Sequence, residues 1–105
     1  TTKLLNSLAE SNSLWERRAA VMFTFAFIRE FELDDTLRLC KKLLNDPHDL
    51  MHKACGWMLR ELGKQDLGAL REFLDANVKK MPRTMLRYAI EKLPERERQM
   101  WLKRD

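Results

Sequence analysis

A short motif that recurs about every 35 residues limits the folds open to this chain. Arg18-Ala19-Ala20 is followed 35 residues later by Lys53-Ala54-Cys55, and Arg87 comes 34 residues after Lys53. Pro47 and Pro82 are also 35 residues apart. A period of this length is typical of stacked helical hairpins, in which each repeat packs on the next one. The spacing therefore predicts an α-solenoid.

The segments between these markers have the pattern of helices. The chain has only three glycines and three prolines, and no apolar-polar alternation is long enough for a β-strand. Residues 14–30, drawn as a helix, are apolar on nearly every side, which predicts a helix packed between neighbouring helices. Further helices are expected over residues 34–45, after Pro47 with an end suggested by Gly63, over residues 66–77, and after Pro82 and Pro94.

The predicted fold is all-α: an α-α superhelix of HEAT-like repeats, forming a right-handed solenoid fragment of about six to seven helices. The period is close to that of tetratricopeptide repeats, but their tryptophan and glycine signature is missing, which favours the HEAT-like form. We expect residues 1–105 to be a single domain. Because the chain opens without a methionine in an apolar-periodic stretch, we expect it to be the C-terminal part of a larger domain truncated upstream of Thr1.

Composition and charge limit the kinds of partner that we expect for this chain. The chain is 45% hydrophobic and 34% charged, and no apolar run approaches the ~20 residues of a membrane span. With no membrane segment or secretory signal and only two cysteines, we expect a cytoplasmic protein with reduced thiols. The net charge of +4 is concentrated after residue 78, which fits an anionic partner or merely a soluble surface. His48, His52 and Cys55 lack zinc spacing, so we expect no metal and no cofactor.

One helix places a tryptophan among cations. Lys53, Trp57, Arg60 and Lys64 share one helical stripe, and the apolar residues of the helix occupy the opposite half: Met51, Ala54, Cys55, Met58, Leu59 and Leu62. If the equivalent helices of successive hairpins line one concave wall of the solenoid, Arg18, Arg83 and Arg87 lie in register with this stripe. The wall then forms a basic groove suited to a phosphate backbone. The alternative is a solvated face with a tryptophan packed under a neighbouring helix.

Other prominent side chains are expected to have structural roles. We assign Trp15 and Trp101 to packing. Arg17 is expected to pair with an acid such as Glu16, because a buried cation is costly without a partner. Asp49 is expected to cap the helix that starts near Pro47.

Three segments together resemble the C-terminal half of the DNA alkylation repair family, the AlkD-like DNA glycosylases: "LWERRAAVMF", "HKACGWMLRELGK" and "MPRTMLRYAIEKL". The resemblance implies a HEAT-like superhelix that binds duplex DNA with alkylated bases on its concave face, near the nucleoid, as a monomer. It also implies release of N3- or N7-alkylated purines without base flipping. By the same resemblance Trp57 and Arg18 contact the lesion, Arg60 contacts the backbone, and further DNA-binding charge comes from Lys53, Lys64, Arg83 and Arg87.

The chain departs from the family in one respect. The catalytic aspartate of the family stands in a Trp-Trp-Asp-x-Val-Asp stretch, and this sequence has no such stretch. We therefore expect that acid upstream of Thr1, no catalytic residue among residues 1–105, and no enzymatic activity of this chain alone. Two alternatives stay open: a helical repeat that binds an acidic protein or peptide, and a non-catalytic DNA-binding relative.

Overall fold

The computed structural model of the chain describes residues 2–29 and 33–103, and the side chains of residues 3–24 and 33–103 within them. In these residues it contains helices and no strand, which confirms the all-α prediction. The elements are α1 (Thr2–Ala9), α2 (Leu14–Arg29), α3 (Asp34–Lys42), α4 (Asp49–Gln65), α5 (Leu67–Asn77), the 3-10 helix η1 (Val78–Lys80), α6 (Arg83–Ala89) and α7 (Glu95–Lys103). None of these helices has the length and apolar character needed to cross a membrane.

Most predicted helices lie where the sequence placed them, with differences at the ends. α2 covers the expected segment up to Arg29, and Glu30 and the side chains of residues 25–29 lie outside the described part. α3 ends at Lys42, three residues before the expected end, because Leu43 leaves the helical conformation. α4 continues past Gly63, which is not a helix cap. A Cβ at Gly63 would lie 2.5 Å from Leu70 Cδ2, so the missing side chain lets Leu70 of α5 pack closely against α4.

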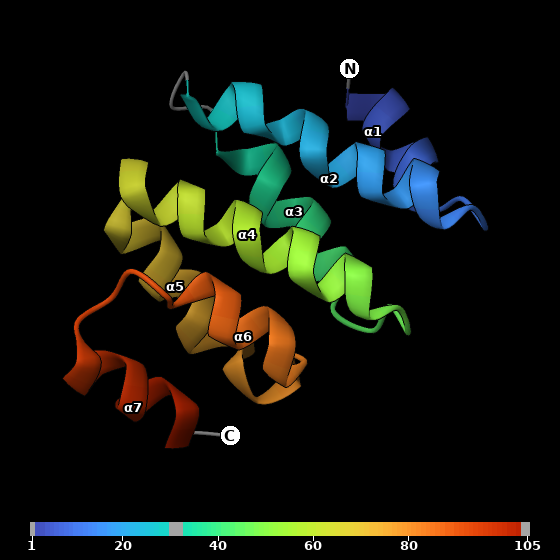
Figure 1. Cartoon of the computed structure of the whole chain (residues 1–105). Coiled ribbons are helices and arrows are strands. Elements are labelled where there is room, and N and C mark those ends of the chain that lie inside the picture. Colours follow the sequence, from blue (N-terminus) through green and yellow to red (C-terminus); the bar gives the residue numbers. More distant parts are fainter. Residues whose placement is uncertain (1, 30–32, 104–105) are drawn as a thin grey trace.

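The helices form two layers. α2, α4 and α6 lie side by side and run in the same direction, and α4 contacts both of its neighbours extensively (Figure 1). α3 and α5 lie behind them in the view of Figure 1. The molecule measures 38 × 30 × 18 Å, and its smallest dimension suits two layers of helices packed about 10 Å apart. The hairpins α2–α3, α4–α5 and α6–α7 are the repeats that the 35-residue spacing predicted.

The core lies between the two layers. All six apolar residues that were expected on the inner face of α4 are buried: Met51, Ala54, Cys55, Met58, Leu59 and Leu62. Trp101 is also buried, as predicted, and its Nε1 donates a hydrogen bond to Glu97 (3.1 Å). Cys40 and Cys55 are free and buried. A hydrogen bond with Cys55, together with burial, raises the pKa of the Cys40 thiol well above its ordinary value.

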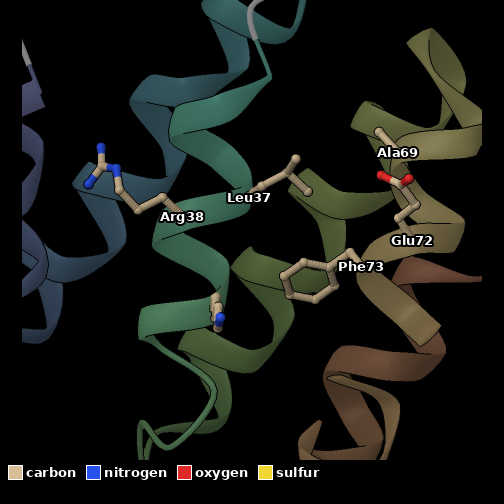
Figure 2. Close-up of a pocket in the computed structure, with 6 residues that line it drawn as sticks. Leu37, Arg38, Ala69, Glu72 and Phe73 are labelled. Carbon is tan, nitrogen blue, oxygen red and sulfur yellow. The ribbon is translucent and has the colours of Figure 1, made fainter. Parts of the chain in front are cut away.

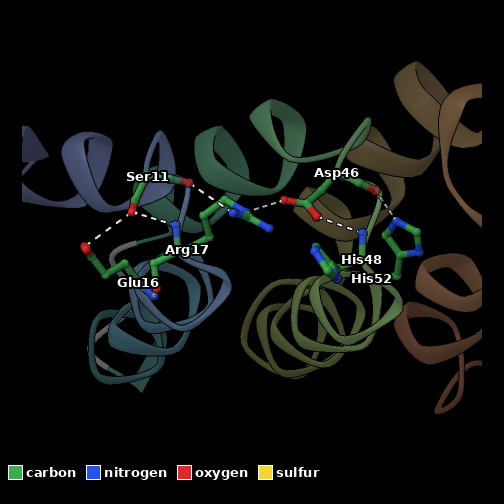
Figure 3. Close-up of polar contacts among 7 residues, drawn as sticks. Ser11, Glu16, Arg17, Asp46, His48 and His52 are labelled. Atoms are coloured by element: carbon green, nitrogen blue, oxygen red, sulfur yellow. Dashed lines mark hydrogen bonds and ion pairs between the residues drawn. The ribbon is translucent and has the colours of Figure 1, made fainter.

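An ion pair joins the start of α2 to the turn before α4 (Figure 3). Arg17 Nε lies 2.7 Å from Asp46 Oδ2, and only 11% and 4% of the two side chains are exposed. Arg17 also donates to the carbonyl oxygen of Ser11 (3.0 Å), while Asp46 Oδ1 accepts from the backbone N–H of His48 (2.9 Å). The prediction that Arg17 pairs with an acid is confirmed, with Asp46 and not Glu16 as its partner. These bonds fix the position of α2 along α4.

Candidate nucleic-acid interface

The layer formed by α2, α4 and α6 has an open hollow of about 270 Å³ on its outer side. Its lining combines cations with aromatic and apolar residues: Arg18, Leu50, Lys53, Ala54, Trp57, Arg60 and Tyr88. Arg18 comes from α2, Tyr88 comes from α6, and the others come from α4. The structure thus brings four of the predicted site residues together, and the described residues that line the hollow include no carboxylate.

Trp57 has two environments. It is half-buried and packs against the hydrophobic core, and it also lines the hollow. The helical stripe accounts for both, because Trp57 lies at the border between the buried face of α4 and its cationic face. The packed interpretation of this tryptophan is therefore met in part, and its contact with a ligand stays a prediction.

Two of the cations have acidic neighbours at the rim. Arg60 Nη1 lies 3.0 Å from Glu91 Oε2 on the segment after α6, and Arg60 Nε lies 3.4 Å from Glu61 Oε2. Lys53 Nζ lies 3.4 Å from Asp49 Oδ2, one turn earlier on α4. Exposed pairs such as Lys53–Asp49 are worth little in water, so they leave the lysine available to an anion.

The position of Asp49 corrects one prediction. The residue that precedes α4 is His48, and no side chain caps the helix there. Asp49 lies inside the first turn, where its carboxylate pairs with Lys53, so the cap assignment was wrong. The turn is held instead by Asp46, which accepts the backbone N–H of His48.

Trp15 corrects a second prediction. It was assigned to packing, but in the first turn of α2 it is 67% exposed. Arg18 Cζ lies 5.9 Å from the centre of the Trp15 ring, within the range of a cation–π contact. Among the residues that the structure describes, no acid forms an ion pair with Arg18. Arg18 is thus held at the hollow by an aromatic ring and has no acidic partner among these residues.

The remaining predicted cations lie elsewhere. Lys64 pairs with Glu61 (3.0 Å) and shares a smaller adjoining hollow with Arg60. Arg83 donates to the carbonyl oxygen of Leu102 in α7 (3.0 Å), and Arg87 lines a hollow between α6 and α7. Arg83 and Arg87 are one turn apart and face α7, whereas Tyr88 faces α4. The structure therefore does not bring these two arginines to the hollow around Trp57.

Tyr88 and Leu50 are lining residues that the sequence analysis missed. A signal for Tyr88 was present, because Arg18, Lys53 and Tyr88 are spaced by 35 residues in each step. The prediction instead named the neighbouring residue, Arg87, because it is charged. All three members of the exact 35-residue series line the same hollow.

Another hollow, of about 410 Å³, lies between α3 and α5 on the opposite layer (Figure 2). Leu37 and Phe73 form its apolar floor, and Arg38, Lys41 and Glu72 lie around it. It contains an acid and no tryptophan. Its chemistry suits a nucleic acid less well than the hollow around Trp57.

The sequence model of a family described as DNA alkylation repair enzyme matches residues 1–93. This range includes every residue that lines the hollow around Trp57. No curated protein and no solved structure matches the chain.

Proposed function

The chain belongs to the DNA alkylation repair enzyme family, and from this premise we propose that it binds duplex DNA in the hollow around Trp57. In this proposal the chain is the C-terminal half of a HEAT-like DNA glycosylase that excises N3- or N7-alkylated purines. The observation that carries the proposal is the meeting of Arg18, Lys53 and Arg60 around one indole, with no carboxylate among the described lining residues.

The three cations suit phosphates. A phosphate backbone binds to Lys and Arg largely by releasing its condensed counterions, and the affinity falls steeply with salt. Arg18 is the strongest candidate for a direct contact, because no acid among the described residues neutralises it. Arg60 would exchange its exposed partner Glu91 for a phosphate. Lys64, Arg83 and Arg87 would add positive charge farther along the duplex, with Lys64 nearest.

Trp57 suits the sugar at the lesion. Cleavage of a glycosidic bond passes through a sugar with oxocarbenium character, and an indole face attracts such a cation. Cleavage also needs a carboxylate to stabilise that cation or to orient the attacking water. Because the described lining offers none, we propose that this chain contributes binding and does not cleave alone.

The test is binding of the full chain to two fluorescent duplexes, measured by anisotropy between about 50 and about 200 mM NaCl. One duplex is undamaged, and the other contains a single pyrrolidine abasic analogue, whose ring is cationic. Two or three phosphate contacts predict a slope of about −2 to −3 for the logarithm of affinity against that of salt. We expect Arg18→Ala to reduce this slope by about one and Trp57→Ala to weaken the pyrrolidine complex more than the undamaged one.

Lys79→Ala is the matched control, because Lys79 is exposed on η1, away from the hollow. The proposal is wrong if neither duplex binds at low salt, or if Lys79→Ala reduces binding as much as Arg18→Ala does. An acidic peptide added as a competitor tests the other function considered for this groove. Displacement of DNA by low concentrations of the peptide, with tighter binding of the peptide than of either duplex, would favour a protein-binding repeat.

A further inference from the structure

We propose that Tyr88 is a second aromatic contact for the deoxyribose at Trp57, and that it sets the preference for a cationic sugar over a neutral one. The inference rests on the proposed function, and it concerns a residue of α6 that the family resemblance does not assign. In this arrangement Arg18, Lys53 and Arg60 hold the flanking phosphates, and the sugar meets the two aromatic side chains.

The core of the protein does not need the phenol of Tyr88. The inner face of α6 and the turn after it are buried through Met85, Leu86, Ala89 and Ile90. Tyr88 is 36% exposed and lines the hollow. An aromatic side chain that remains partly exposed beside a tryptophan and three cations is available to a ligand.

Two contacts fix Tyr88 beside Trp57. Gly56 immediately precedes Trp57, and a Cβ at Gly56 would lie 2.5 Å from Tyr88 Cβ and 2.6 Å from the carbonyl oxygen of Met85. The missing side chain therefore lets α6 approach α4 at this point. One turn later the Arg60–Glu91 ion pair (3.0 Å) joins the same two segments. The root of Tyr88 is thus held against the α4 backbone next to Trp57, between these two contacts.

The electrostatics explain why a tyrosine suits this position. Arg18 and Lys53 occupy the equivalent places in the two preceding repeats, so a cation at residue 88 would complete a row of three. Such a row would bind phosphates more strongly, but it would repel a positively charged sugar in the same hollow. A phenol removes that repulsion and adds an aromatic face that attracts a cation.

The experiment compares the duplex containing pyrrolidine with one containing tetrahydrofuran, a neutral abasic ring of the same size. The readout is the ratio of the two dissociation constants. We expect Tyr88→Ala to reduce the preference for pyrrolidine about 3- to 10-fold and Tyr88→Phe to keep it within about twofold. Lys79→Ala is again the control, because Lys79 is exposed on η1 and does not line the hollow.

A second variant, Tyr88→Lys, separates a ligand contact from a structural role. It should tighten binding to undamaged duplex and steepen the salt slope by about one, while it reduces the preference for pyrrolidine. A variant that merely perturbed the fold would weaken all complexes together.

The outcomes distinguish this inference from the proposed function. If the wild type prefers pyrrolidine and Trp57→Ala reduces the preference while Tyr88→Ala does not, the role of Tyr88 is wrong and the proposed function stands. An equal loss of the preference for pyrrolidine in Tyr88→Phe and Tyr88→Ala also overturns the role of Tyr88, because the face of the aromatic ring then does not set that preference. If the wild type binds no duplex, the proposed function fails and the inference fails with it.

Discussion

Replacing Gly56 by alanine tests whether the close approach of α4 and α6 builds the hollow. The added Cβ would lie 2.5 Å from Tyr88 Cβ and 2.6 Å from a backbone oxygen of Met85, neither of which can rotate away. Ordinary van der Waals contact begins near 3.4 Å. The two helices must therefore separate locally by about 1 Å, and a gap of that size forfeits roughly a quarter to a half of each dispersion contact along it.

The expected net effect of Gly56→Ala is a loss of about 1 to 2 kcal/mol in the free energy of unfolding. Overpacking costs about 1 to 3 kcal/mol, and the higher helix propensity of alanine offsets up to about 1 kcal/mol of it. For a domain of this size the corresponding decrease in Tm is about 4 to 16 °C. Urea denaturation followed by far-ultraviolet circular dichroism measures the free energy, and a thermal melt measures Tm.

Gly68→Ala is the matched control for this prediction. Gly68 lies in the first turn of α5, and a Cβ there would have its nearest neighbour at 3.4 Å, in Asp66. We expect this variant to be unchanged or stabilised by up to about 1 kcal/mol. If Gly56→Ala proves as stable as the wild type, the reasoning from the close approach is refuted.

Two further predictions concern ion pairs. Asp46→Ala leaves the buried guanidinium of Arg17 without its partner and should cost about 3 kcal/mol or more in urea denaturation; a loss below about 1 kcal/mol would show that the pair is dispensable. Hydrogen bonds from Arg71 hold the pKa of Glu97 below its ordinary value, although burial opposes them. The ionised Glu97 therefore stabilises the fold at pH values above the ordinary pKa of a glutamate. This stabilisation is lost as the pH falls through the lowered pKa of the folded state. Thermal melts between about pH 6 and about pH 3 should show that the difference in Tm between the wild type and Glu97→Gln becomes smaller as the pH falls. A constant difference in Tm would contradict this assignment.

Periodicity was sufficient to predict the helical layers. The positions of apolar residues in α4 define its buried face, because a helix in a small protein must bury one stripe. Helix ends were harder to predict, and Gly63 shows why. A glycine signals a helix end only when the backbone needs its conformational freedom, whereas here it makes room for Leu70, which lies on another helix. Such a contact between helices leaves no local mark in the sequence.

The candidate site was predictable where its residues share one helix. Lys53, Trp57 and Arg60 follow from a single helical stripe on α4. The contribution of α6 was not predicted correctly, because the repeat period shifts between 34 and 35 residues and one residue changes the direction of a side chain by about 100°. Charge favoured Arg87, and packing at Gly56 placed Tyr88 in the hollow instead.

The position of α4 between α2 and α6 has a consequence for how the protein unfolds. In a repeat array each element is stabilised mainly by its neighbours, so α2 and α6 are coupled to each other chiefly through α4. A duplex that contacts Arg18 on α2 and Tyr88 on α6 would supply a second, direct coupling between the outer repeats. Amide hydrogen exchange in the bound state should then slow in all three helices together, and the separate opening of an end repeat would merge into one cooperative unfolding step.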